Sequence, residues 1–112
     1  MYGKNGPLPK KRLIIHGLVS GKDFARLADE LSISKATAEV YGVDCLAAGQ
    51  DVSHNSIAEY IDVTKESLAI IKSEIIGAQD KKLRTVHDKL GEVYTYNQIR
   101  FVLACLIQDL EL

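Results

Sequence analysis

One pattern of residues occurs twice in this sequence, at 27–41 and again at 57–71, and the two copies align without a gap. The first copy reads Leu-Ala-x-x-Leu-Ser-Ile-Ser-x-x-Thr-Ala-x-x-Tyr, and the second reads Ile-Ala-x-x-Ile-Asp-Val-Thr-x-x-Ser-Leu-x-x-Ile. Apolar residues recur every three or four positions on both sides of a short polar break, which is the spacing of two amphipathic helices. Each copy therefore predicts a pair of helices joined by a tight turn.

Several positions of the first copy meet the demands of two helices that cross steeply over a turn of three or four residues. Ala28 is small enough for the second helix to approach the first, Ile33 fills the corner, and Ser34 is a favourable N-cap. Ser32 stands where such turns commonly have glycine. Because a left-handed serine costs about 1 kcal/mol, we expect a slightly different turn there, whereas Asp62 in the second copy tolerates that conformation better. The pattern is typical of a helix-turn-helix.

The helix-turn-helix is expected over 22–49, and the second, motif-like copy follows after a polar break. Apolar spacing also predicts a helix from Lys10 to about Gly21 and another over 81–90. We expect the second copy to open with a capping box formed by Ser56 and Glu59.

Thr95 and Gln98 have the same capping-box spacing and predict the start of the last helix. Residues 92–96 show a brief alternation, so a short winged element there stays open as an alternative. The predicted fold class is all-α: a compact multi-helix domain over 10–112, preceded by a flexible leader or linker at 1–9 that holds both prolines.

The first copy is the better candidate for nucleic-acid contact, because the outward positions of its second helix are polar or small, as groove contact requires. We expect Lys35, Thr37 and Glu39 to face the groove of bound DNA. The second copy has Ile70 and Ile71 at this place, which favours a role in the core. We expect two groups of cations to contact backbone phosphates, although each group also fits a solvated surface. These are Lys10, Lys11 and Arg12 near the start, and Lys81, Lys82 and Arg84 on the sixth helix.

The charge balance limits the kind of nucleic-acid contact that this chain can make. The sequence has 14 lysines and arginines and 15 aspartates and glutamates, for a formal net charge of −1. Such a balance argues against a highly basic protein whose affinity comes from its overall charge. Contact through one local face stays open, and we expect it to be weak and sensitive to salt.

Residues that carry catalytic or metal chemistry are sparse. His16, His54 and His87 lie far apart, and none pairs with a cysteine or carboxylate at ligand spacing, so we expect no metal site and no cofactor. No glycine-rich phosphate loop or nucleophile motif occurs, which argues against an enzyme. Cys45 and Cys105 lie in apolar stretches and predict buried free thiols. With no apolar run of membrane length and no signal peptide, this favours an intracellular protein without a membrane partner, in a prokaryotic cytoplasm or a eukaryotic nucleus.

The order of these features resembles the helix-turn-helix domain found near the C-terminus of some RecQ-type DNA helicases, including the Werner type, and of related bacterial proteins. The resemblance covers roughly residues 13–107. It rests on Gly21-Lys22, Phe24-Ala-Arg-Leu-Ala-Asp-Glu-Leu31, Ser34-Lys-Ala-Thr37, Ala48-Gly-Gln-Asp-Val52 and Tyr94-Thr-Tyr-Asn-Gln-Ile-Arg-Phe-Val-Leu-Ala104. It implies a non-catalytic accessory DNA-binding or regulatory module, with a helicase core elsewhere in a longer polypeptide.

Two other functions stay open at this point. The same helices could form a protein–protein interaction module of a DNA-processing enzyme, for which an exposed apolar patch and indifference to DNA would be typical. Alternatively, the chain could be a free-standing helix-turn-helix transcription regulator that dimerises through its apolar last helix.

Overall fold

The computed structural model describes residues 9–80, 82–91 and 93–112. The leader predicted at 1–9 therefore lies outside the described residues except for Pro9, and so does Lys81. The described part forms helices without any strand, and the all-α prediction is confirmed. These helices are α1 (Pro9–Val19), α2 (Phe24–Leu31), α3 (Lys35–Ala47), α4 (His54–Tyr60), α5 (Lys65–Gly77), α6 (Leu83–Lys89) and α7 (Tyr96–Ile107).

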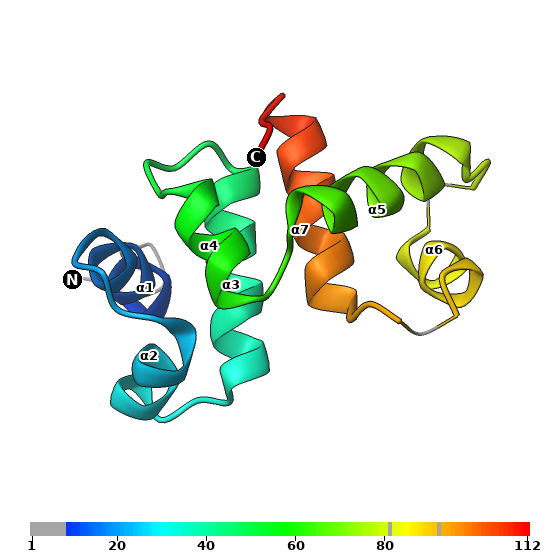
Figure 1. Cartoon of the computed structure of the whole chain (residues 1–112). Coiled ribbons are helices and arrows are strands. Elements are labelled where there is room, and N and C mark those ends of the chain that lie inside the picture. Colours follow the sequence, from blue (N-terminus) through cyan, green and yellow to red (C-terminus); the bar gives the residue numbers. More distant parts are fainter. Residues whose placement is uncertain (1–8, 81, 92) are drawn as a thin grey trace.

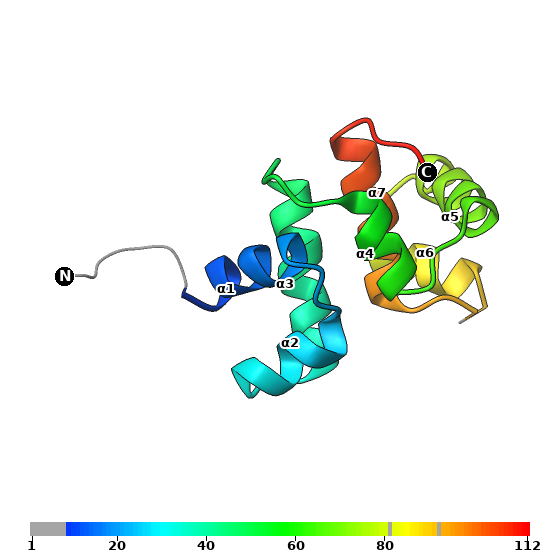
Figure 2. The ribbon, with the colours of Figure 1, turned by 60° about the vertical axis from the view of Figure 1, so that its left-hand side comes forward.

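Helix α3 is the central element of the fold. Figure 1 shows α1 and α2 on one side of it and α7 on the other, with α5 and α6 beyond α7. The view turned by 60° gives the same order (Figure 2). Consequently the molecule is elongated, with principal extents of 45, 25 and 24 Å, and α1 and α6 lie at opposite ends.

The turns of the two copies have the same backbone geometry. Ser32 and Asp62 both adopt the left-handed conformation, with φ angles of 56° and 61°. After each of them, an apolar residue donates its backbone N–H to the small alanine of the preceding helix: Ile33 to Ala28 O at 3.0 Å, and Val63 to Ala58 O at 2.8 Å. The expectation of a different turn at Ser32 is therefore wrong, because this hydrogen bond holds the serine in the left-handed region.

The same turn also joins α1 to α2. Gly21 has a φ of 87°, and Lys22 donates its N–H to Gly17 O at 2.9 Å. Asp23 then caps α2 by accepting a hydrogen bond from the N–H of Arg26. The repeated residue pattern did not predict this turn, because Lys22 stands where the turns of the two copies have an apolar residue.

Hydroxyl caps begin three of the later helices. Thr64 accepts from the N–H of Ser67 at the start of α5, and Thr95 forms the predicted capping box with Gln98 at the start of α7. The box predicted for Ser56 is wrong, because Ser53 is the N-cap of α4 and accepts from the N–H of Ser56. The winged element proposed for 92–96 does not form in the described residues 93–96, where the chain turns directly into α7.

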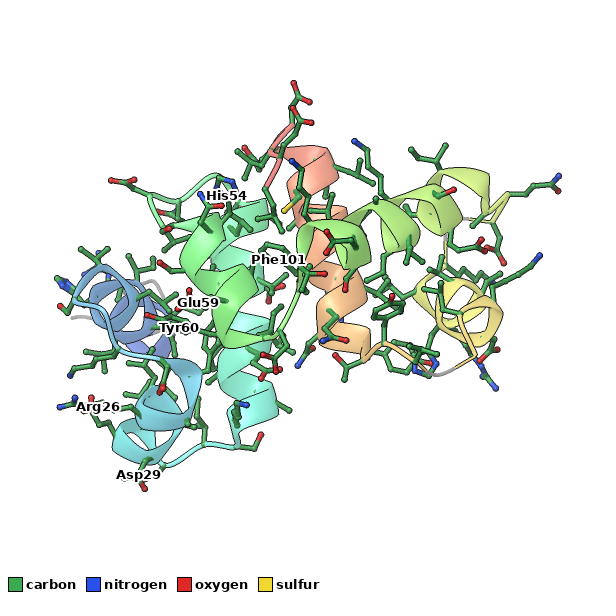
Figure 3. All side chains as sticks on the ribbon, in the orientation of Figure 1. Arg26, Asp29, His54, Glu59, Tyr60 and Phe101 are labelled. Atoms are coloured by element: carbon green, nitrogen blue, oxygen red, sulfur yellow. The ribbon has the colours of Figure 1, made fainter. Side chains whose placement is uncertain are left out.

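The core joins both copies into one cluster of buried side chains. Phe24 on α2 packs edge-on against Tyr60 on α4, with ring centroids 6.0 Å apart. Phe101 is fully buried on the side of α7 that faces α3 and α4 (Figure 3). In α5, Ile71 is fully buried while Ile70 is 49% exposed, so the predicted core role of that helix is confirmed for one of its faces only.

Candidate nucleic-acid interface

The outer face of α3 is a stripe of small and polar side chains. Its cap is formed by Ser34, whose hydroxyl accepts from the N–H of Thr37 at 3.0 Å. Residues three and four positions apart share one side of a helix, and α1, α2 and α7 cover the rest of α3. One side of α3 and its C-cap stays at the surface, and its residues, which we call the α3 stripe, are Ala36, Thr37, Val40, Asp44 and Ala48.

The structure separates the three residues that were expected to face a groove together. Thr37 belongs to the α3 stripe. Lys35 and Glu39 lie one turn apart on another face and form an ion pair with an N–O distance of 3.7 Å. The Glu39 side chain is only 14% exposed, because it packs towards α7. Residues at i and i+2 point to different sides of a helix, and for this reason the alternating set Lys35, Thr37 and Glu39 cannot form one surface.

Asn97 of α7 holds the inner side of the α3 N-terminal turn. It is 8% exposed, and its side-chain amide donates to the Glu39 carboxylate at 2.9 Å and to Ala36 O at 3.2 Å. Its carbonyl oxygen accepts a hydrogen bond from Arg100 at 3.0 Å. Arg100 is thereby placed beside the α3 stripe.

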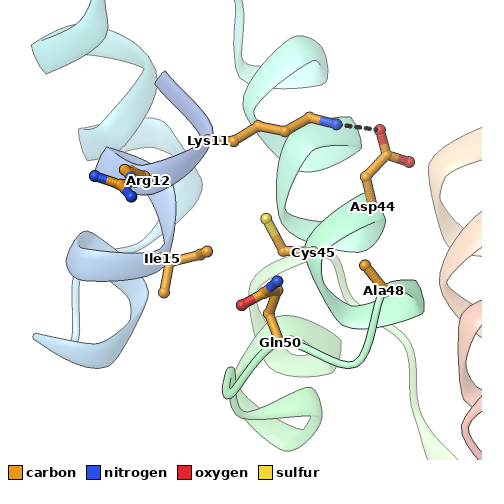
Figure 4. Close-up of a pocket in the computed structure, with 7 residues that line it drawn as sticks. All are labelled: Lys11, Arg12, Ile15, Asp44, Cys45, Ala48 and Gln50. Atoms are coloured by element: carbon orange, nitrogen blue, oxygen red, sulfur yellow. Dashed lines mark hydrogen bonds and ion pairs between the residues drawn. The ribbon is translucent and has the colours of Figure 1, made fainter. Parts of the chain in front are cut away.

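The cations of α1 lie on the opposite flank of the stripe. Lys11 forms an ion pair with Asp44 at 3.4 Å, and its ammonium group lies 5.8 Å from the centroid of the Tyr41 ring. Lys11 and Arg12 line a cavity of about 480 Å³ between α1 and α3 (Figure 4). Lys10 and Arg12 are exposed on α1, and Lys11 is the α1 cation that contacts a residue of the stripe, Asp44.

The two cysteines are buried, Cys45 on α3 and Cys105 on α7. Cys45 lines the cavity between α1 and α3 (Figure 4), and burial raises its thiol pKa. Burial also raises the pKa of Cys105 to about 11. Both cysteines are free and buried, as the sequence predicted, and both are neutral thiols at neutral pH.

Two further cations, Lys22 in the turn before α2 and Arg26 on α2, share a single acid. Glu30 accepts from Lys22 at 2.9 Å and from Arg26 at 3.2 Å. These two hydrogen bonds, Lys22 first, hold the pKa of Glu30 below its ordinary value of 4.5. Arg26 and Asp29 point away from α3 on the outer side of α2 (Figure 3), so α2 adds little positive charge to the stripe.

The second predicted group of cations lies at the other end of the molecule. Lys82 and Arg84 are exposed on or beside α6, and α7 separates that helix from α3 (Figure 1). Lys81 lies outside the described residues. The structure therefore does not bring these cations together with Lys10, Lys11 and Arg12 on one face.

Val40, Asp44 and Asn97 are residues of this region that the sequence pattern did not assign to the site. The α3 stripe could have been found by taking every fourth position from Ala36 together with the neighbouring Thr37. The place of Arg100 depends on how α7 crosses α3, and no local pattern carries that information. Neither a cluster of three metal-ligating side chains nor a helix long and apolar enough to cross a bilayer is found in the described part of the chain.

Comparison with known proteins agrees with the turn geometry. A family model described as a helix-turn-helix domain matches residues 16–103, which include both copies and most of α7. Neither the curated proteins nor the solved structures contain a match.

Proposed function

Because the chain belongs to the family of helix-turn-helix domains, we propose that it is a non-catalytic DNA-binding or regulatory module and that the α3 stripe is its DNA-contacting surface. Helix-turn-helix domains bind DNA by laying the second helix of the motif in the major groove. In this chain that helix is α3, and its N-terminal half carries Ala36, Thr37 and Val40 on the exposed side.

The observation that carries this proposal is the chemistry of the stripe and of its two flanks. Small side chains let a helix approach base edges closely, and an apolar or hydroxyl side chain can contact a thymine methyl group or accept and donate hydrogen bonds. Lys10, Lys11 and Arg12 stand on the α1 flank, where they can contact backbone phosphates. A groove-facing helix with flanking cations is the arrangement that DNA recognition needs.

The resemblance of the sequence to the RecQ and Werner type supports a more specific role, as an accessory module of a helicase whose ATPase core lies elsewhere in the same polypeptide. Such a module needs only modest affinity of its own, because a tethered site works at high effective concentration. The net charge of −1 fits this role, since it limits nonspecific attraction to DNA. We expect the protein to act inside the cell, where DNA is present.

A direct test places a negative charge on the stripe. Ala36→Glu adds an acid to the first turn of α3, where the helix dipole favours it, so the fold should keep its stability. We expect Ala36→Glu to weaken binding to a fluorescein-labelled duplex by tenfold or more, measured by anisotropy at low salt. Ala69→Glu is the matched control, because Ala69 is an exposed alanine of α5. Equal affinities of both variants and the wild type, or no binding by the wild type, would contradict the proposal.

A second candidate is a protein–protein interaction module. Val19, Val93 and Ile107 are 69%, 73% and 61% exposed, but they lie on separate elements, and it is a contiguous apolar patch that favours contact with another protein. A free-standing regulator is also compatible with the fold. For such a regulator the sequence predicts dimerisation through α7, but little of α7 is exposed, because most of that helix packs against α3, α5 and α6. If this protein binds a helicase core and shows no affinity of its own for DNA, the result would favour the interaction module.

A further inference from the structure

Arg100 lies in a shallow groove between α3 and α7. The groove is lined on the α3 side by Ala36, Thr37 and Val40, which belong to the α3 stripe, and on the α7 side by the first two turns of that helix. Any molecule that lies along the N-terminal half of the stripe therefore also meets Arg100.

The side chain of Arg100 is held by neutral partners. Its Nη1 donates to the carbonyl oxygen of Asn97 at 3.0 Å. Its guanidinium carbon lies 5.9 Å from the centroid of the Tyr96 ring. The Tyr96 ring in turn stacks on His87, with centroids 4.1 Å apart and planes inclined by 10°. These contacts fix the position of the guanidinium group without neutralising its charge.

Several cations near α3 are paired with carboxylates, whereas Lys10 and Arg12 on α1, like Arg100, have no ion pair within the described residues. Lys11 pairs with Asp44, Lys35 pairs with Glu39, and Lys22 and Arg26 share Glu30. Within the described residues, no carboxylate lies within ion-pair distance of Arg100. A guanidinium group has five N–H donors in a planar fork, and the contacts above use one of them. Arg100 thus presents free donors beside the stripe and has no direct ion pair in the described residues, although the Asn97 side chain that binds it also binds the Glu39 carboxylate.

From this geometry we propose that the α3–α7 groove binds a backbone phosphate of DNA and that Arg100 is its ligand. The inference rests on the proposed function, because it requires DNA to lie along the α3 stripe. A guanidinium fork matches two oxygens of a phosphodiester, and an arginine already ordered by stacking loses little entropy on binding. Arg100 and the α1 cations then contact DNA phosphates on the two sides of α3, and these contacts fix the orientation of α3 in the major groove of the DNA.

The test compares three variants of the full chain in anisotropy titrations with a short fluorescein-labelled duplex at several KCl concentrations. We expect Arg100→Ala to weaken binding about tenfold at low salt, as loss of a charged hydrogen-bonded contact does. It should also reduce the slope of log K against log salt by about 1, because one phosphate contact is lost. Arg100→Lys should keep the slope and lose part of the affinity, because the charge remains without the fork.

Lys65→Ala is the matched control, because Lys65 is an exposed cation of α5 and its removal changes the net charge equally. Thermal unfolding of each variant checks that the fold is kept. Suppose that the wild type binds DNA and that Ala36→Glu weakens this binding as expected. If Arg100→Ala then leaves the slope of log K against log salt unchanged, this inference is overturned and the proposed function stands. Equal losses in Arg100→Ala and Lys65→Ala would also overturn it, since affinity would then follow charge alone. If the wild type binds no DNA, the proposed function and this inference both fail.

Discussion

The side-chain amide of Asn97 on α7 donates a hydrogen bond to the carboxylate of Glu39 on α3, with an N–O distance of 2.9 Å. Asn97 is 8% exposed, and polar groups in such positions are costly when they lose their partners. This pair links the closing helix to the N-terminal half of the helix that we assign to DNA contact. It therefore serves both the stability of the fold and the placement of the α3 stripe.

Asn97→Ala should lower the free energy of unfolding by about 1–3 kcal/mol, because it leaves the Glu39 carboxylate and Ala36 O without their buried donor. Urea unfolding monitored by circular dichroism measures the change. Asn55→Ala serves as the control, since Asn55 is exposed on α4 and should change stability by less than about 0.5 kcal/mol. Similar losses in both variants would show that the link contributes nothing particular.

Ser32→Gly should stabilise the protein by about 0.5–1 kcal/mol. Ser32 has a φ of 56°, and glycine removes the steric cost of a side chain in the left-handed region. The control is Ser73→Gly, at an exposed position inside α5, where the lower helix propensity of glycine should cost about 0.5 kcal/mol. If both changes destabilise the protein in urea unfolding, the left-handed turn at Ser32 is not the conformation in solution.

Gly42→Ala should destabilise the protein by about 1–3 kcal/mol although alanine is the better helix former. A Cβ atom at position 42 would lie 2.6 Å from the Phe24 ring, and this overpacking outweighs the gain in propensity. Gly77→Ala is the matched change, because nothing lies within 4 Å of a Cβ atom there, and it should raise the melting temperature slightly. A neutral effect of Gly42→Ala would mean that α2 and α3 do not pack as closely as described.

Stability should depend on pH through Glu30. Its pKa in the folded protein lies below the ordinary value of 4.5, so the ionised form stabilises the fold above that pH, and the contribution is lost as the pH falls through the folded-state pKa. Glu30→Gln should therefore be less stable than the wild type at neutral pH, and the difference should shrink in acid. Asp51→Asn, at an exposed site, should show no such convergence in urea midpoints. A difference that grows in acid would contradict this assignment.

Most of the helices could be predicted from the sequence because their signals are local. The repeated pattern located both tight turns, and Thr95 with Gln98 located the start of α7. The errors have local physical causes as well. A serine has an intrinsic free-energy cost in the left-handed region, but at Ser32 the hydrogen bond from the N–H of Ile33 to Ala28 O stabilises the turn. Ser53 and Ser56 are both good caps, and the earlier one begins α4.

The candidate site could be predicted only in part, because it is built from elements far apart in the chain. Thr37 and the α1 cations were found from residue type and spacing. Glu39 was expected on the surface, yet its partner Asn97 lies 58 positions away. The place of Arg100 likewise follows from the crossing of α3 and α7, which the sequence of either helix does not specify.

The central claim, that the α3 stripe contacts DNA, is tested most directly by an amide chemical-shift titration of the isotope-labelled protein with a short duplex at low salt. We expect the largest shifts on Ala36, Thr37 and Val40, with smaller shifts on α1 and around Arg100. Shifts confined to α5 and α6, or no shifts at all, would contradict it.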